Sequence, residues 1–254
     1  MINQQESRGI LKIVFDRPDK KNAFTDAMYR DFKDALVAGD LNEEVKVILI
    51  CGAGNTFTSG NDLQDFLNKP MTGDDAPPLE LLRTLAQLKK PLVAAVNGFA
   101  VGIGATMLFH CDLVYAQKNA QFIFPFTSLG LVPEGAVSLL MPRLIGHQRS
   151  SEILFFGEPL SAHEASQIGF VSKVVSDDSA LQYAEQQAMR LTKLSSGAIL
   201  NTKSLLKGNL IQSEVLNQIN NEGRIFLERL QGTAAKEALL AFMEKRKPNF
   251  DGLN

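Results

Sequence analysis

Hydrophobic and polar positions follow two different periods along the chain, and each period predicts a different kind of element. Residues 8–15, RGILKIVF, alternate as is typical of a β-strand, and residues 45–54, VKVILICGAG, form a short apolar run that ends in glycines. Residues 25–41 and 79–90 instead carry apolar side chains at helical spacing. Strands that alternate with helices predict an α/β fold with buried parallel strands.

The middle of the chain continues this alternation, whereas the C-terminal part does not. Residues 90–116 are typical of a strand, a glycine-rich turn, a short helix and a second strand, and short strands are expected at 120–125 and 170–175. After about residue 177 the strand signals stop and only helical periods remain. We therefore divide the chain into a mixed α/β core, residues 1–195, and a helical C-terminal region, residues 196–254.

Composition restricts the partners of this protein. The chain has 254 residues, 45% of them hydrophobic, which is enough for one large core. Its net charge of -2 gives no basic footprint for nucleic acid. No stretch approaches the roughly 20 apolar residues of a membrane span, and no signal peptide is visible. The three histidines and two cysteines lack metal-ligand spacing, so we expect a soluble cytoplasmic protein without a metal site.

Two glycine-containing segments follow buried strands: FTSGNDL, residues 57–63, and NGFAVGIGA, residues 97–105. Glycine allows the backbone to approach a ligand closely, so a peptide N–H in such a turn can donate to an oxyanion. Each segment alone could equally serve only as a tight turn. Residues 97–105 are not a dinucleotide fingerprint, because no acidic residue about 20 positions later ends a following strand.

A third segment, LGLVPEGA at residues 129–136, contains the carboxylate Glu134 in an apolar run. No other Asp or Glu occurs between Leu113 and Ser151. Burying a carboxylate costs free energy unless it is hydrogen-bonded or its raised proton affinity is used. Glu134 could serve as a catalytic base, or it could cap the next helix or pair with Arg143. Spacing alone leaves these alternatives open.

Taken together, these segments resemble the crotonase (enoyl-CoA hydratase/isomerase) superfamily in order and spacing, along with FPFTSLGLVPEGA and GEPLSAHEASQIGFVSKVV. The resemblance extends from residue 16 to residue 250. It implies a crotonase-like β/α spiral core with a helical oligomerisation region, and hence a homotrimer or a dimer of trimers. It also implies an acyl-CoA substrate; because coenzyme A is part of that substrate, no separate cofactor is expected.

The resemblance assigns roles to individual residues. Crotonases hold the thioester oxygen with two backbone N–H groups, which fall here at Asn61 and Ile103. Hydratases of the family use two glutamates, and this chain has Thr106 and Phe126 at those positions. Glu134 occupies the position of the catalytic base in the peroxisomal-type Δ3,Δ2-enoyl-CoA isomerases. One carboxylate is sufficient for that reaction, because it can move a proton from carbon 2 to carbon 4.

The resemblance also implies a coenzyme A site. The turn at residues 16–24 would hold the adenine and phosphate end, and the C-terminal AFMEKRK would reach coenzyme A of the same or a neighbouring subunit. A charged surface turn and a basic helix end would look the same, and Asp62 could equally brace its loop. The loop at 68–78 should affect pocket depth. The expected contacts are Lys20, Lys21, Asn22, Ala23, Asp62, Phe242 and Lys245.

The sequence thus predicts an isomerase that converts 3-enoyl-CoA to trans-2-enoyl-CoA in unsaturated fatty acid oxidation. An enoyl-CoA hydratase or another crotonase reaction, such as acyl-CoA hydrolysis or dehalogenation, is the alternative within the same fold. A non-catalytic acyl-CoA-binding scaffold is the alternative of a different class.

Overall fold

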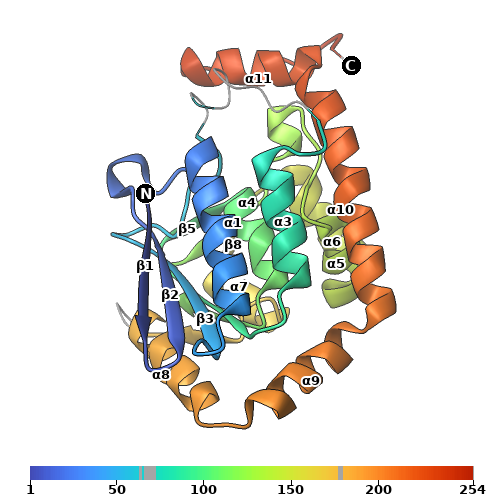
Figure 1. The fold of residues 1–254 in the computed structure, drawn as a ribbon. Coiled ribbons are helices and arrows are strands. Elements are labelled where there is room, and N and C mark those ends of the chain that lie inside the picture. The colour runs from blue at the N-terminus through green and yellow to red at the C-terminus, as the bar shows by residue number, and fades with distance from the viewer. Residues whose placement is uncertain (63–64, 66–72, 177–179, 254) are drawn as a thin grey trace.

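Two sheets organise the protein, and both appear in Figure 1. The computed structural model describes residues 1–62, 65, 73–176 and 180–253. The larger sheet has six strands in the order β1-β2-β3-β4-β6-β9, of which β1 and β2 are antiparallel and the other pairs are parallel. Its strands are β1 (Ile2–Ser7), β2 (Ile10–Phe15), β3 (Val47–Gly52), β4 (Leu92–Val96), β6 (Leu113–Gln117) and β9 (Lys173–Val175).

The smaller sheet begins directly after β4. It has three strands in the order β5-β7-β8, which are β5 (Phe99–Val101), β7 (Gln121–Ile123) and β8 (Leu160–Ser161). Only Asn97 and Gly98 separate β4 from β5, so the chain passes from one sheet to the other within two residues. The glycine-rich segment 97–105 is therefore located where the two sheets meet.

Helices cover both faces of the larger sheet (Figure 1). Helices α1 (Asp26–Leu41) and α3 (Pro77–Gln87) pack against each other over one face, and α8 (Ala180–Thr192) packs on β3, β4 and β6 over the other. The other helices in the described residues are η1 (Pro18–Lys20), α4 (Ile103–Thr106), η2 (Met107–His110), η3 (Thr127–Leu129), α5 (Val137–Ile145), α6 (His147–Phe156), α7 (Ala162–Gln167), α9 (Ser196–Lys207), α10 (Asn209–Leu230) and α11 (Thr233–Met243).

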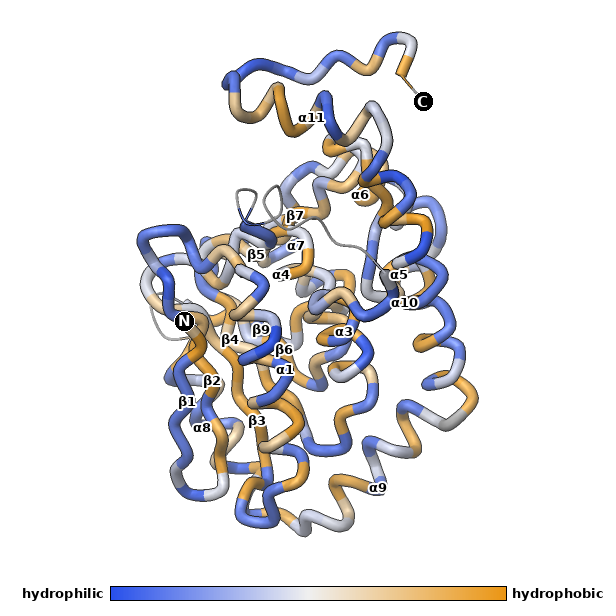
Figure 2. The backbone as a smooth tube through the Cα atoms, turned by 45° about the horizontal axis from the view of Figure 1, so that its top comes forward, coloured by the Kyte–Doolittle hydropathy of each residue, from blue (hydrophilic) through white to orange (hydrophobic). Residues whose placement is uncertain are grey.

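The two middle strands, β3 and β4, carry no polar side chain because both of their faces are covered. In β3, Ile48 and Ile50 join the core under α1 and α3, whereas Val47 and Leu49 join the core under α8. Figure 2 shows β3 in the hydrophobic colour and the edge strand β1 largely in the hydrophilic one. The predicted α/β fold is therefore confirmed; β1 was not predicted, because its sequence INQQES lacks an apolar face.

The C-terminal helices pack on the core and on the site region. Helix α10 lies along α3 and α5 (Figure 1). Helix α11 contacts η3. Helix α9 is anchored by Lys203, whose buried ammonium group donates to the Asp112 carboxylate at 2.6 Å and to the Lys90 carbonyl at 2.7 Å. Large apolar side chains remain exposed where α9 meets α10: Leu205, Leu206 and Leu210.

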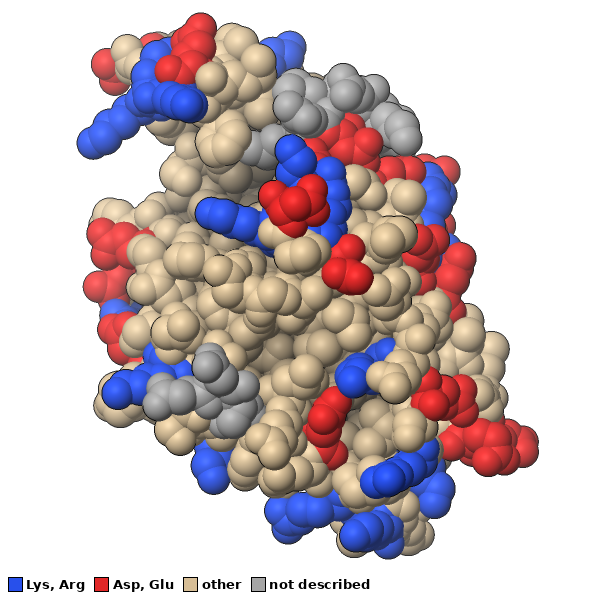
Figure 3. All heavy atoms as spheres, turned by 90° about the vertical axis from the view of Figure 1, so that its left-hand side faces the viewer, with Lys and Arg blue, Asp and Glu red and all other residues tan. Residues whose placement is uncertain are grey.

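Charged side chains are distributed unevenly over the surface. On the face drawn in Figure 3, acidic and basic groups lie near one another toward the margins, and a broad area without charge lies near the middle. Among the described helices, none combines the length and the apolar character needed to cross a membrane. Of the loop expected to shape the pocket, residues 68–72 lie outside the described part of the chain.

Phe32 provides a test of the core packing. It is fully buried and meets Phe15 edge-on, with ring centroids 5.0 Å apart. Replacing Phe32 by Ala should lower the free energy of unfolding by about 3–5 kcal/mol, because it removes buried apolar area and leaves a cavity. The control is Phe156→Ala on α6, where the side chain is exposed and the cost should stay below about 1 kcal/mol. Urea unfolding of the three proteins measures the difference; equal midpoints would contradict this packing.

Candidate active site

One cavity collects most of the residues that the sequence singled out. Its volume is about 630 Å³, and it is lined by side chains and backbone from the N-terminal turn, both glycine-rich segments, residues 125–134 and the last two helices. The predicted residues that line it are Lys20, Lys21, Ala23, Asn61, Asp62, Ile103, Glu134 and Phe242. The remaining walls are largely apolar and include Leu129, Leu131 and Phe226, which the sequence analysis did not identify.

The two predicted oxyanion donors are held on neighbouring segments. Thr58 pairs with Ala100 in a parallel bridge, in which the Thr58 N–H donates to the Phe99 carbonyl at 3.1 Å and the Val101 N–H donates to the Thr58 carbonyl at 3.0 Å. Beyond this bridge, Asn61 and Ile103 both line the cavity. Neither of their N–H groups donates to another residue within the described part of the chain. Buried N–H groups are almost always hydrogen-bonded, so two backbone donors without a protein acceptor beside one cavity agree with the predicted oxyanion site.

Glycine is required on both segments. Gly60 has a φ of +85°, and a Cβ there would lie 2.8 Å from the Val101 carbonyl oxygen. Gly102 has a φ of +54° and a ψ of -122°, a combination that side chains exclude, and it immediately precedes α4. Ile103 is the first residue of α4, so its N–H has no intrahelical acceptor. Later in the same helix, the N–H groups of Ala105 and Thr106 both donate to the Gly102 carbonyl.

Glu134 is a buried carboxylate at the edge of this cavity. The residue is 2% exposed, and its Oε1 atom has no hydrogen-bond partner among the described residues. Burial, and secondly the negative charge of Glu222, raise the pKa of Glu134 from 4.5 to about 8. A carboxyl group in this state is a stronger base than an exposed one once it loses its proton, which suits it to proton abstraction.

The two structural alternatives for Glu134 are not observed. Arg143 points to a different partner, Glu214, with its guanidinium nitrogen 2.8 Å from the carboxylate. Helix α5 is capped by Glu222, which accepts the N–H groups of Ala136 and Ser138 at 2.6 and 2.9 Å. Glu134 is thus neither the cap of this helix nor the partner of Arg143.

The two positions at which family hydratases have glutamates are filled without a carboxylate. Thr106 is fully buried, with its hydroxyl 3.4 Å from the Ile103 carbonyl, and Phe126 contributes its ring to the cavity wall. The second carboxylate in the lining is Asp62, which forms an ion pair with Arg17 at 2.5 Å. Its negative charge is therefore compensated, and it braces the loop by accepting the Asp65 N–H at 3.1 Å.

The residues expected to contact coenzyme A separate into two groups. Lys20, Lys21 and Phe242 line the cavity, with both lysines exposed and Phe242 62% exposed. Asn22 is instead fully buried, and its amide nitrogen donates to the Thr56 carbonyl at 2.6 Å. Its side chain supports the turn and is not directed to a ligand. Lys245 is exposed beyond the end of α11 and does not line the cavity.

Tyr29 was not singled out by the sequence, although it adjoins the site. It belongs to α1, is 3% exposed and donates its hydroxyl to the side-chain oxygen of Asn61. Burial, and then the charge of Glu134, raise the pKa of Tyr29 well above its ordinary value, so the hydroxyl stays neutral. Its position was not predictable because α1 follows an ordinary amphipathic pattern.

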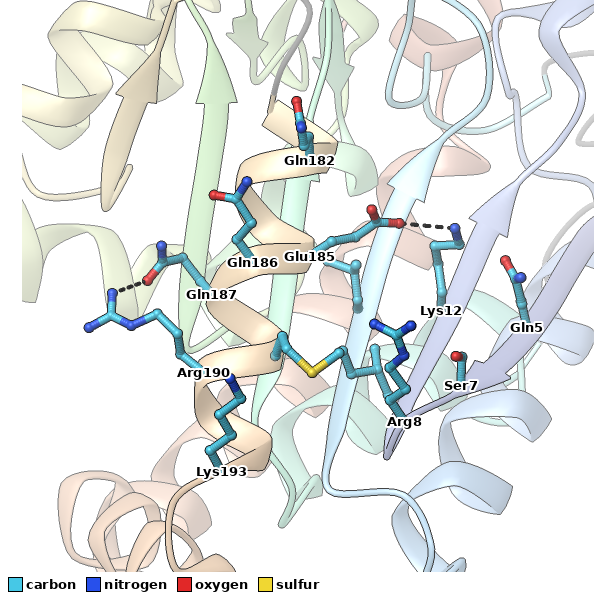
Figure 4. Close-up of a pocket in the computed structure, with 13 residues that line it drawn as sticks. Gln5, Ser7, Arg8, Lys12, Gln182, Glu185, Gln186, Gln187, Arg190 and Lys193 are labelled. Atoms are coloured by element: carbon cyan, nitrogen blue, oxygen red, sulfur yellow. Dashed lines mark hydrogen bonds and ion pairs between the residues drawn. The ribbon is translucent and has the colours of Figure 1, made fainter.

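A second cavity of about 600 Å³ is separate from this site. Figure 4 shows it between the β1–β2 hairpin and α8, with the long polar side chains of Gln182, Gln186 and Arg190 extending from the helix. Lys12 and Glu185 meet across it at 3.0 Å. It contains none of the predicted site residues, and it opens on the sheet face covered by α8.

Comparison with known proteins identifies the class of this protein. The chain belongs to the enoyl-CoA hydratase/isomerase family, whose model matches residues 5–253. It is 32% identical to 1,2-epoxyphenylacetyl-CoA isomerase of Escherichia coli (strain K12), with 96% of each chain covered. It is 36% identical to enoyl-CoA delta isomerase 2 of Rattus norvegicus over 86% of this chain, and the match spans 59% of that longer protein.

A solved structure supports the same assignment. The crystal structure of an enoyl-CoA hydratase/isomerase from Pseudoalteromonas atlantica T6c matches with a TM-score of 0.92 and 37% identity. The match covers 98% of this chain and 99% of that one. The crotonase fold predicted from the sequence is therefore confirmed along essentially the whole chain.

The raised pKa of Glu134 predicts how stability depends on pH. Between the ordinary value of 4.5 and the folded value of about 8, the folded protein binds more protons than the unfolded chain, so this residue lowers stability as pH rises. Glu134→Gln should therefore unfold with a free energy about 1–4 kcal/mol higher than wild type at pH 8, and the gain should vanish near pH 4.

Thermal or urea unfolding at several pH values measures this difference. Glu158→Gln, at an exposed position, is the matched control and should change stability little at any pH. A Glu134→Gln variant with the same gain at pH 4 and pH 8 would show that the buried carboxyl group does not carry the pH dependence.

Proposed function

We propose that this protein is a Δ3,Δ2-enoyl-CoA isomerase that acts on unsaturated fatty acyl-CoA. The observation that carries the proposal is the state of Glu134. It is the one carboxylate in the described cavity lining without a cationic partner, it is dehydrated, and it shares the cavity with the backbone at Asn61 and Ile103. Its position in VPEG matches that of the base in family isomerases.

In the proposed reaction, the thioester oxygen accepts hydrogen bonds from the N–H groups of Asn61 and Ile103. The Glu134 carboxylate removes a proton from carbon 2, and the electron pair moves toward the thioester to form a dienolate. The same carboxyl group then returns the proton to carbon 4, so the double bond ends between carbons 2 and 3. Each backbone donor is worth about 2.7–4 kcal/mol, because the negative charge develops only during the reaction.

Hydration is the weaker alternative for this site. Adding water across the double bond requires groups that orient and deprotonate a water molecule. Thr106 and Phe126 offer no carboxylate for this purpose, and the walls around Glu134 are apolar. A non-catalytic scaffold would have no use for an unpaired buried carboxylate, which costs stability above pH 5.

Binding of coenzyme A and self-association are part of the proposal. Lys20 and Lys21 supply two cations at the cavity for phosphate groups, and Phe242 supplies an aromatic surface within the same chain. Coenzyme A is a portion of the substrate, so the proposed reaction needs no separate cofactor. The exposed apolar side chains of Leu205, Leu206 and Leu210 support an assembly of several copies, which we propose is a homotrimer or a dimer of trimers.

The decisive variant for the function is Glu134→Gln, which keeps the size of the side chain and removes the base. We expect conversion of trans-3-hexenoyl-CoA to the 2-enoyl-CoA to fall at least about a thousandfold in kcat, with KM changed less than severalfold. Hydration of crotonyl-CoA by the wild type should be very slow. A variant that retains isomerase activity, or a wild type that hydrates faster than it isomerises, would refute the proposal.

The lysine turn gives a separate test of substrate binding. The double variant Lys20→Ala, Lys21→Ala should raise KM for the CoA ester about tenfold or more, with kcat nearly unchanged, because the phosphates are far from the reacting carbons. Raising the salt concentration should weaken wild-type binding more than binding by the variant. The control is Lys118→Ala, at an exposed position away from the cavity. An unchanged KM would rule out this turn as the phosphate site.

A further inference from the structure

A second buried carboxylate lies next to the Glu134 turn, and it comes from the far end of the chain. Glu222 belongs to α10 and is 4% exposed. Its two oxygens accept the Ala136 N–H at 2.6 Å, the Ser138 N–H at 2.9 Å and the Ser138 hydroxyl at 2.5 Å. Glu222 does not line the cavity, so it is positioned to act on Glu134 and not on a ligand.

The turn that carries Glu134 is held from both sides. Gly135 and Ala136 both have a positive φ, of 76° and 61°, so this backbone conformation is strained at Ala136 and needs outside support. On one side the Gly135 carbonyl contacts the His110 ring nitrogen at 2.9 Å. On the other side, the Glu222 carboxylate accepts the N–H groups of Ala136 and Ser138. The two residues that follow Glu134 are therefore both anchored, Gly135 to η2 and Ala136 to α10.

Capping alone does not explain a glutamate at position 222. A neutral hydroxyl or amide oxygen can accept helix N–H groups without the cost of burying a charge. Glu222 instead brings a second acidic group to a site where an acid is already buried, and its charge acts on Glu134 strongly enough to contribute to that residue's raised pKa. The charge therefore has an effect that a neutral cap would lack.

We propose that Glu222 is a positioning residue for Glu134: by accepting the Ala136 and Ser138 N–H groups, it locks the 134–136 turn and keeps a second acidic side chain beside the catalytic carboxylate. This inference rests on the proposed function of Glu134 as the base. Glu222 contacts neither the substrate nor the cavity, so it acts on Glu134 only through the backbone turn and through the electrostatic effect of its charge.

Within the described part of the chain, the other titratable groups that surround Glu134 do not carry a compensating charge. Tyr29, from α1, remains a neutral phenol, as its raised pKa requires. His110, from η2, is neutral because burial, and then the charge of Lys207, lower its pKa to about 4. Burial raises the pKa of Glu222 itself to about 7, and the hydrogen bonds from Ser138 and Ala136 oppose this effect. The hydrogen bonds that Glu222 accepts from the Ala136 N–H, the Ser138 N–H and the Ser138 hydroxyl favour its ionised form.

Three variants separate the charge of Glu222 from its hydrogen bonds. Glu222→Gln keeps the length, removes the charge and replaces one accepting oxygen by an amide nitrogen, whereas Glu222→Asp keeps the charge and shortens the reach. Ser138→Ala removes the hydroxyl that donates to Glu222 and accepts from Gln218, and leaves both N–H bonds to Glu222 in place. The pH dependence of kcat/KM for trans-3-hexenoyl-CoA is measured for each. The protonation of Glu134 is followed independently by carbon-13 NMR of labelled glutamate carboxyls, with the Glu134 signal assigned through its loss in Glu134→Gln.

For Glu222→Gln we expect the Glu134 titration and the acid limb of kcat/KM to move together toward lower pH, by about one unit. The plateau rate should fall severalfold, because the carboxylate is a weaker base and its turn is less well held. Glu222→Asp should keep a titration near that of wild type while losing rate. Ser138→Ala should move the Glu134 titration less than Glu222→Gln does, because the acidic group at position 222 is kept. A Glu222→Gln titration identical to wild type would overturn the inference.

Failure of the inference and failure of the proposed function give different results. If the Glu134→Gln variant is active, both the proposed function and the inference are wrong. If Glu134→Gln is inactive and the Glu134 titration is unshifted in Glu222→Gln, only the inference is wrong. If Glu222→Gln does not fold, the same NMR titration of the wild-type protein provides the test. Two coupled carboxyl titrations near neutral pH support the inference, and a single one overturns it.

Discussion

The structure depends on the burial of one ionisable carboxylate in a mostly apolar cavity. Removing water from Glu134 costs free energy in the charged form, and that cost is what raises its pKa to about 8. The same absence of water strengthens hydrogen bonds from the backbone to a developing oxyanion. Stability and chemistry are therefore opposed at this residue: the condition that makes Glu134 a good base also makes the folded protein less stable as pH rises.

The fold meets this condition by bringing distant segments together at one point. The chain leaves the large sheet after β4 and enters the small sheet at β5, and this sheet change sets residues 58–61 beside residues 100–103. The C-terminal helices then complete the cavity, with Phe226 from α10 and Phe242 from α11 in its walls. Helix α10 also supplies Glu222, so the N-terminal core alone would contain neither the support for the turn nor the full apolar wall.

Features encoded within a short stretch were predictable, and features that depend on packing were not. The glycine turns around Gly60 and Gly102 pointed to available backbone N–H groups, because only glycine tolerates that geometry. Glu222 could not be found this way, since it lies in a polar helical segment whose buried face is decided by α3 and α5. Asn22 looked like a ligand contact in a basic turn, but its left-handed backbone and buried amide serve the turn itself.

The most direct measurement follows one hydrogen atom through a turnover. The substrate is trans-3-hexenoyl-CoA carrying deuterium at carbon 2, converted in ordinary water, with the label located in the first product formed. A single dehydrated carboxyl group that shuttles the proton predicts that a substantial part of the deuterium appears at carbon 4. Product with only solvent hydrogen at carbon 4, even at the earliest times, would contradict a base shielded from water.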